Sequence, residues 1–226
     1  MTQQTTTQQT TTSPGGIVTT PSTATQFADP ATEERLQRVA AALEANNFVV
    51  EILDDVAAAR TRIKDLIPEG ASVFTSSSET LRLSGIDEDI NTGGRYRALK
   101  PRVLAMDRAT EADEIRRLLA SPDVVVGSVA AVTETGSLVV ASATGSQLPA
   151  YSGGAAQAIL IVGAQKVVPD LGTALRRLEE YVYPLEDARA QKVYGSPSAI
   201  NRVLVLNGEL RSGNRTVLLL REAIGF

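Results

Sequence analysis

The stretch that most constrains the fold lies between Asp123 and Asp170, where three short apolar runs are separated by clusters of Gly, Ser and Thr. The runs cover residues 124–126, 138–140 and 159–162. Short continuous runs that are rich in β-branched residues and bounded by turn formers are typical of strands buried on both faces of a sheet. We therefore expect these three strands to build the core of the protein.

Strand and helix patterns alternate along the rest of the chain. This alternation indicates an α/β fold with one open, mostly parallel sheet that is flanked by helices. Two further apolar runs, 203–206 and 217–220, are separated by turn formers and predict a C-terminal antiparallel hairpin. The remaining expected elements are helices at 30–47, 56–67, 110–120 and from Asp170 to Pro184, strands at 48–53, 71–75, 103–106 and 166–168, and an irregular loop at 86–102.

The chain divides into a tail, residues 1–29, and a folded domain, residues 30–226. The tail consists largely of Thr, Gln, Ser and Pro. It buries too little apolar surface to offset the entropy of ordering, so we expect it to be disordered. The sequence shows neither a secretory signal nor an apolar run that could span a membrane, and we expect a cytoplasmic protein.

Composition excludes several kinds of chemistry. The chain contains no Cys and no His, which removes disulfides, thiol nucleophiles, Cys-ligated iron–sulfur clusters, Ser-His-Asp catalysis and typical zinc sites. The net charge of −4 argues against nucleic acid or an anionic membrane as the main partner. Any catalysis must therefore use carboxylates, Lys, Arg, Tyr, hydroxyls or backbone dipoles.

Glu134 is the first candidate site residue, because it is an isolated carboxylate in a small, neutral segment between two predicted strands. The following Gly136 lets backbone approach closely, and Thr133 and Thr135 carry hydroxyls that could bind a ligand. Glu134 could act as a general base if burial raises its pKa. In the structural alternative, Glu134 caps backbone N–H groups or pairs with an Arg, and the hydroxyls satisfy turn backbone.

A second group of candidates would bind an anion. Ser76, Ser77 and Ser78 follow a predicted strand, and Ser76 with Glu79 fits a capping box, so a helix start there would offer free N–H groups at the carboxyl end of the sheet. The alternative is only a well-capped helix. Arg95 and Arg97 could likewise hold a carboxylate or phosphate, or simply belong to a solvated loop.

Gly153, Gly154 and Lys166 complete the candidates. The two glycines could open a helix against the serine segment or merely permit close packing. Lys166 follows a predicted strand and could be a catalytic amine, although an exposed solubilising lysine is the more common case.

These motifs together resemble the LUD domain of lactate utilisation proteins of the stand-alone C type. The resemblance is carried by Val-Gly-Ser-Val-Ala-Ala-Val-Thr-Glu-Thr-Gly-Ser-Leu-Val-Val at 126–140, the following Leu-Pro, and the Ile-Leu-Ile-Val strand with Val-Val-Pro-Asp. Ser-Ser-Glu-Thr-Leu at 77–81 and Gly-Ser-Pro-Ser-Ala-Ile at 195–200 also fit. The resemblance spans residues 32–226.

The resemblance implies a fold similar to that of ribose-5-phosphate isomerase, glucosamine-6-phosphate deaminase and CoA transferases. In the CoA transferases a glutamate on a comparable segment is the nucleophile, which implies a catalytic role for Glu134. It also implies a link to the conversion of L-lactate to pyruvate beside two iron–sulfur partners. Since the chain has no Cys, the partners would handle the electrons, and we expect no cofactor and no metal in this chain.

Three functions follow as hypotheses. The first is a component of L-lactate utilisation that binds a small anionic ligand and acts with iron–sulfur proteins. The second is a stand-alone enzyme that acts on a small carboxylate, acyl-CoA or sugar phosphate through Glu134, in a pocket that also holds Ser76 to Ser78 and an Arg. The third is a purely structural or regulatory module in which Glu134 is salt-bridged and lines no pocket. Further copies of the chain are an additional candidate partner.

Overall fold

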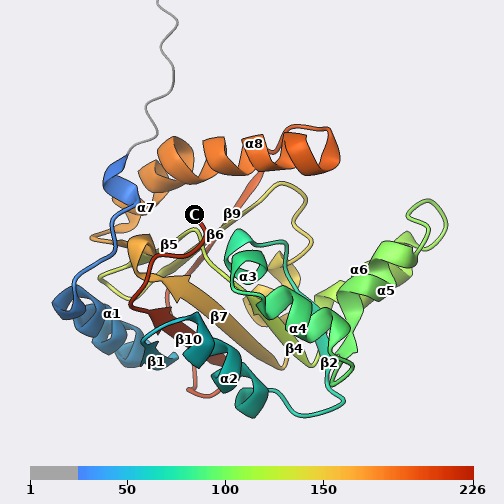
Figure 1. The fold of residues 1–226 in the computed structure, drawn as a ribbon, viewed down its shortest axis with the longest axis horizontal. Helices are drawn as coiled ribbons and strands as arrows, with labels where there is room; N and C mark the ends of the chain where they lie inside the picture. The colour runs from blue at the N-terminus through green and yellow to red at the C-terminus, as the bar shows by residue number, and fades with distance from the viewer. Residues whose placement is uncertain (1–24) are drawn as a thin grey trace, which may run out of the picture.

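A computed structural model describes residues 25–226 and confirms an open, mostly parallel α/β sheet (Figure 1). The main sheet has six strands in the order β1-β10-β7-β4-β2-β3, and every neighbouring pair is parallel. Its strands are β1 Val49–Leu53, β2 Ser72–Thr75, β3 Arg97–Ala98, β4 Val124–Gly127, β7 Gln157–Gly163 and β10 Arg215–Leu220.

The central strand β7 shows why a continuous apolar run is needed. Leu160 and Val162 pack into the hydrophobic cluster on one face of the sheet, and Ile159 and Ile161 pack into the cluster on the other. All four side chains are fully buried. Because successive strand residues point to opposite faces, only an uninterrupted apolar run can fill two cores.

Helices cover both faces of the main sheet (Figure 1). Ile63 of α2 and Ile90 of α4 are buried in one cluster, whereas Leu43 of α1 and Val103 of α5 are buried in the other. The two layers leave no exposed apolar face on the central strands. These helices are α1 Glu33–Ala45, α2 Val56–Leu66, α3 Glu79–Leu83, α4 Ile86–Thr92, α5 Leu99–Ala105 and α6 Ala112–Ala120.

A second, four-stranded sheet takes up part of the central stretch. Its order is β8-β5-β6-β9, with β5 antiparallel to β6, β6 antiparallel to β9, and β5 parallel to β8. The three expected strands do share a core, because Val125, Leu138 and Leu160 lie in one buried cluster. They come from two sheets, however, since residues 138–140 lie in this one and the other two runs lie in the main one. The strands are β5 Ala131–Thr133, β6 Leu138–Ser142, β8 Val167–Val168 and β9 Arg202–Leu206.

The predicted C-terminal hairpin is wrong. β9 pairs with β6 in the second sheet, whereas β10 lies in the main sheet between β1 and β7. All six residues of β10 are buried, which requires a central position, while β9 begins with two exposed residues and forms a sheet edge. The turn formers between the two strands carry the chain from one sheet to the other.

The predicted irregular loop at 86–102 and the predicted strand at 103–106 are also wrong. This region folds into α4, the short β3 and α5. Ile86 and Ile90 are buried one helical turn apart, and Leu99 and Val103 repeat the pattern. The many charged residues of the segment therefore mark the outer faces of short helices and not a loop.

The last helical region runs past its predicted stop at Pro184. α7 Leu171–Arg177 begins at the N-cap Asp170 and continues through η4 Leu178–Val182, a turn of π-helix, into α8 Tyr183–Tyr194. Pro184 lies in the first turn of α8, directly after the π-helical turn, where the backbone already departs from the regular α-helical hydrogen-bond pattern. The chain before this region forms η3 Ala164–Lys166 and the predicted short strand, β8.

The tail that was predicted to be disordered comprises residues 1–29, of which residues 1–24 lie outside the described part of the chain. The described remainder of that tail begins with η1 Thr25–Phe27, and Phe27 is buried with its ring centroid 6.4 Å from that of Tyr181. Within residues 25–226, no helix combines the length and apolar character that crossing a bilayer requires.

Candidate functional site

Glu134 lies in the turn between β5 and β6, held by two arginines of α1. Its Oε1 accepts from Arg35 Nε at 2.7 Å, and its Oε2 accepts from Arg38 Nε at 3.4 Å. The Glu134 amide donates to Val168 O at 2.8 Å. The carboxylate is thus charge-balanced and joins α1 to the second sheet.

The pKa of Glu134 is lowered, whereas a general base at neutral pH needs a raised pKa. Burial raises the pKa, but the hydrogen bond from Arg35 and the charges of Arg35 and Arg38 outweigh that effect, so the pKa lies below the ordinary 4.5. Glu134 is therefore ionised at neutral pH and a weak proton acceptor. This geometry matches the structural alternative, and a nucleophilic role for Glu134 stays a prediction.

The rest of this turn is also internally satisfied. Thr133 Oγ1 lies 2.8 Å from Thr135 Oγ1 and accepts from Ser137 N at 2.9 Å. Gly136 has φ +81°, and a Cβ there would lie 2.6 Å from Ala42 O. The glycine is thus required for close approach to α1, as expected. Ligand binding by Thr133, Thr135 and Gly136 stays a prediction.

The serine segment does not form the predicted capping box. Ser78 is the N-cap of α3, and its Oγ accepts from Leu81 N at 3.4 Å. Ser77 is exposed. Ser76 is instead buried, with Oγ 2.9 Å from Tyr151 Oη. The spacing between Ser76 and Glu79 fits a capping box, but the helix begins two residues later than a cap at Ser76 would require, with Ser78 as its N-cap.

Arg95 and Arg97 lie at the opposite end of the sheet from the serines. Arg97 is paired in register with Ser72, the first residue of β2, and binds Gly70 O at 2.9 Å. Since β2 and β3 are parallel, their first residues share the amino edge, whereas Ser76 to Ser78 follow the carboxyl end of β2. The structure therefore does not bring these predicted ligands together.

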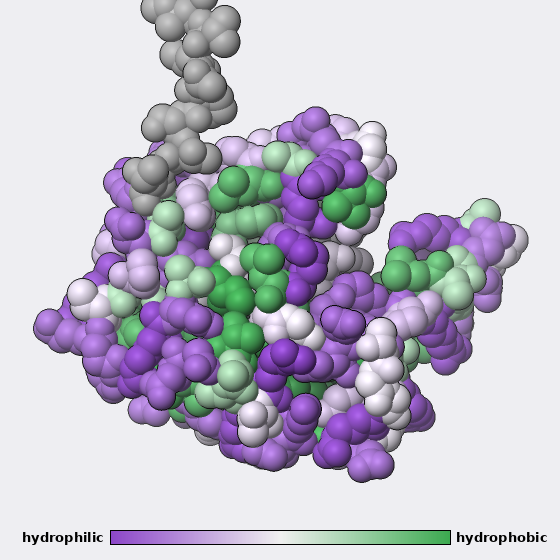
Figure 2. Space-filling model, viewed as in Figure 1, coloured by the Kyte–Doolittle hydropathy of each residue, from purple (hydrophilic) through white to green (hydrophobic). Residues whose placement is uncertain are grey.

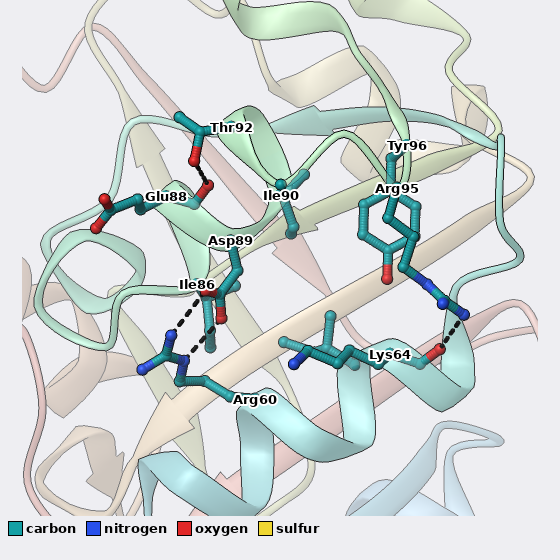
Figure 3. Close-up of a pocket in the computed structure, with 11 residues that line it drawn as sticks. Arg60, Lys64, Ile86, Glu88, Asp89, Ile90, Thr92, Arg95 and Tyr96 are labelled. Carbon is teal, nitrogen blue, oxygen red and sulfur yellow. Dashed lines mark hydrogen bonds and ion pairs between the residues drawn. The ribbon is translucent and has the colours of Figure 1, made fainter.

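Arg95 borders a groove of about 570 Å³ between α2 and α4 (Figure 3). Arg60 and Asp89 form a bidentate ion pair across it, and Arg95 donates to Lys64 O at 3.3 Å. Most of the charged residues that line the groove are exposed to solvent. Neither Glu134 nor any of Ser76 to Ser78 lines this groove.

Lys166 is the residue whose environment departs furthest from expectation. The side chain is only 2% exposed, so the prediction of a solubilising surface lysine is wrong. Its Nζ donates to Thr80 Oγ1 at 2.9 Å, to Ser128 Oγ at 3.0 Å and to Val129 O at 3.1 Å. The three acceptors use all three protons of an ammonium group.

Three neighbouring strands of the main sheet position these groups at one edge. Thr80 follows β2 on α3, Ser128 directly follows β4, and Lys166 follows β7 on η3. β2, β4 and β7 are adjacent and parallel, so their carboxyl ends meet. The carboxyl edge of an open α/β sheet is where such folds bind ligands.

Hydroxyl groups extend the site away from Lys166. Ser128 Oγ donates to Ile161 O at 2.6 Å, and Ser128 N donates to Tyr151 Oη at 3.1 Å. Burial raises the pKa of Tyr151 to about 12, so the phenol stays protonated. We name the group formed by Lys166, Thr80, Ser128, Ser76 and Tyr151 the lysine cluster.

The lysine cluster lacks a negative charge. Within residues 25–226, no carboxylate forms an ion pair with Lys166, and the buried Arg177, which donates to the adjacent Ala130 O, has none either. Burial lowers the pKa of Lys166 well below 10.5, and the charge of Arg177 lowers it further. Burial likewise lowers the pKa of Arg177 to about 10. Buried cations without anions are costly, so such an arrangement suits an anionic ligand.

The end of the chain covers this cluster. Gln165 Nε2 donates to Ile224 O at 2.9 Å and to Gly225 O at 3.1 Å, and Thr80 Oγ1 donates to Ile224 O at 3.4 Å. Figure 2 shows hydrophobic side chains gathered on this face, between α8 and the carboxyl ends of the main strands. Ser128, by contrast, is only partly buried.

One feature of the sequence indicates that Lys166 is buried. Lys166 is a lone charge between two fully apolar segments, Ile-Leu-Ile-Val and Val-Val. A lysine in that setting must be buried unless the chain turns outward. Ser128 and Tyr151 had no such signal. Among the described residues, no group of three or more Asp or Glu side chains could hold a metal ion.

Comparison with known proteins places the chain in a family. A family model described as the LUD domain matches residues 36–221. A crystal structure of a DUF162 family protein from Deinococcus radiodurans has a TM-score of 0.50 and 13% sequence identity, covering 84% of this chain and 99% of that chain, and shows a shared fold. No curated protein matches. Because the family model covers most of the sequence, the chain belongs to the LUD domain family.

Proposed function

We propose that this chain is the component of an L-lactate utilisation system that binds the small carboxylate, L-lactate or pyruvate, at the lysine cluster. The observation that carries the proposal is the buried amino group of Lys166, which has three neutral hydrogen-bond partners and no ion-pair partner in residues 25–226. Membership of the LUD family, which is associated with lactate utilisation, supports the choice of ligand.

The chemistry of the cluster fits such a ligand. A carboxylate next to Lys166 would stabilise the ammonium form of its side chain, because in a low-dielectric site the attraction between opposite charges is stronger than at the surface. Thr80 and Ser128 each carry a hydroxyl that can accept from or donate to the hydroxyl or carbonyl oxygen of the ligand.

Electron transfer would belong to iron–sulfur partners in the cytoplasm. The chain has no Cys or His, so it lacks the usual ligands of a cluster or haem. Oxidation of a 2-hydroxy acid to a 2-oxo acid releases two electrons, which this chain's side chains do not accept. The proposed role is therefore binding and presentation of the acid.

Ligand-induced stabilisation tests the proposal. L-Lactate and pyruvate should each raise the Tm of the full chain, because a ligand that binds only the native state stabilises it by mass action. The rise should vanish in Lys166→Met, which keeps the apolar stem, and persist in Lys192→Met, which removes an exposed lysine of α8. No rise with either acid at saturating concentration would contradict the proposal.

A further inference from the structure

We infer that the amine of Lys166 forms an imine with the carbonyl carbon of a 2-oxo acid, an inference that rests on the proposed function. The geometry that supports it is a fully buried lysine held by two hydroxyls and one carbonyl, with which no carboxylate of residues 25–226 forms an ion pair. A desolvated lysine beside a second cation is the environment in which an amine becomes a nucleophile at neutral pH.

The hydrogen bonds of the cluster can accommodate the uncharged amine. A neutral amine has two protons and one lone pair, so one of the three partners must become a donor. Val129 O only accepts, and Ser128 is committed to Ile161 O at 2.6 Å. Thr80 has the weaker alternative contact, to Ile224 O at 3.4 Å, so its hydroxyl is the one that turns toward Nζ.

The same rotation would loosen the cover over the site. When the Thr80 hydroxyl turns to Nζ, Ile224 O loses that donor and keeps only the bond from Gln165. The rotation therefore removes one of the four hydrogen bonds that Thr80 and Gln165 make to residues 224 and 225.

The reaction balances without an oxidant. The Nζ lone pair bonds to C2 of the 2-oxo acid, and the carbonyl oxygen takes the first of the two amine protons. The C2–O bond then breaks, the oxygen leaves as water with the second proton, and a C2=N bond remains. Thr80, whose Oγ1 lies 2.9 Å from Nζ, is placed to pass these protons.

This chemistry separates the two acids of the proposed reaction. Pyruvate has a carbonyl carbon that Nζ can attack, whereas L-lactate has a hydroxyl carbon and can bind only non-covalently. Once the imine is protonated, its positive charge lies beside the ligand carboxylate. The charge pairing that the proposed function requires is therefore kept in the covalent adduct.

Borohydride trapping on the full wild-type chain tests the inference. The protein is incubated with pyruvate and sodium cyanoborohydride, and intact mass is followed by peptide mapping. The chain has four lysines, at 64, 100, 166 and 192, so the map is unambiguous. We expect about one reduced pyruvyl group per chain, on Lys166, none with L-lactate in place of pyruvate, and none in Lys166→Arg, which keeps the charge; Lys192→Arg should label like wild type.

Each other outcome is decisive. If pyruvate raises the Tm but no adduct forms on Lys166, the imine is wrong and the proposed binding function stands. Labelling spread over the four lysines alike also contradicts the imine, because it reports surface amines. If pyruvate neither raises the Tm nor labels the chain, the inference fails, and if L-lactate gives no rise in the Tm either, the proposed function fails with it.

Discussion

The turn that contains Glu134 and the lysine cluster differ in how their ionisable side chains are buried and paired. The carboxylate of Glu134 is partly exposed, with 24% of its side chain accessible, and two arginines balance it. Lys166 is buried at the end of the main sheet and has only neutral partners in the described residues. The ion pairs of Glu134 indicate a structural contact, whereas the lack of an ion-pair partner for Lys166 among the described residues indicates a binding site.

The difference shows why residue type alone is a poor guide to function. Glu134 attracts attention because it is the one acidic side chain in a neutral segment. Its partners, Arg35 and Arg38, come from a helix almost a hundred residues away and remove its need for a ligand. The candidate binding site is indicated by a buried ionisable side chain without an ion-pair partner among the described residues, and this can be recognised only in the structure.

The largest expected effect concerns the packing that supports the lysine cluster. A Cβ at Gly127 would lie 1.5 Å from Tyr151 Oη and 2.7 Å from Ser76 Oγ, and Tyr151 is too buried to move aside. Gly127→Ala should therefore lower the free energy of unfolding by about 3 kcal/mol, measured by urea denaturation. Gly172→Ala in α7, where a Cβ meets nothing closer than 3.4 Å, is the control and should not destabilise. A Gly127→Ala variant whose free energy of unfolding equals that of the wild type would contradict the described packing.

The second prediction separates the two regions by their response to ligand. L-Lactate at about a hundred times its Kd should stabilise the wild type by ~2.7 kcal/mol. Glu134→Gln should keep this gain, because its side chain lies in the other region, and Lys166→Met should lose it. Calorimetric melting with and without ligand measures both. If Glu134→Gln lost the gain and Lys166→Met kept it, the assignment of the site would be reversed.

The third prediction concerns pH. The pKa of Lys166 is lowered in the native state, so between that value and the unfolded value near 10.5 the unfolded chain holds a proton that the native chain lacks. The stability of the wild type relative to Lys166→Met should therefore rise with pH across this window, by up to ~1.4 kcal/mol per pH unit. Urea titrations between pH 7 and about 10 measure the slope. A flat or falling difference would show that Lys166 keeps its proton.

The smallest expected effect is the removal of the Glu134 charge. Glu134→Gln should cost about 1 kcal/mol at neutral pH, because Arg35 and Arg38 are partly exposed and regain water. The native pKa of Glu134 is lowered, so this contribution is present above the unfolded value near 4.5 and disappears as pH falls through the native value. Added salt should reduce it. A loss of several kcal/mol would indicate a more central role.

Much of the fold was predictable because burial leaves a local pattern. β4 and β7 appear as uninterrupted apolar runs, and the N-caps Thr32 and Asp170 were recognisable from their residue types. Pairing was not predictable in the same way. β9 and β10 look alike as sequences, and only the competition for the central position in the main sheet separates them.

The lysine cluster was only partly predictable. Ser76 was correctly predicted to lie at the carboxyl edge of the sheet, but its predicted role as a helix cap is wrong, because its hydroxyl bonds to Tyr151. Lys166, Thr80 and Ser128 come from three separate strand ends, so their meeting depends on strand order, which periodicity does not encode. That no carboxylate of the described residues forms an ion pair with Lys166 is a property of the assembled fold.

Titration of the lysine amines themselves tests the central claim most directly. With lysine labelled at Cε, each of the four side chains gives its own NMR signal, and Lys166→Met assigns the one of interest. The account predicts that the Lys166 signal titrates well below the ordinary 10.5, and that saturating L-lactate raises this pKa because the ligand carboxylate stabilises the ammonium form. A Lys166 that titrates at its ordinary value, or whose titration L-lactate leaves unchanged, would contradict it.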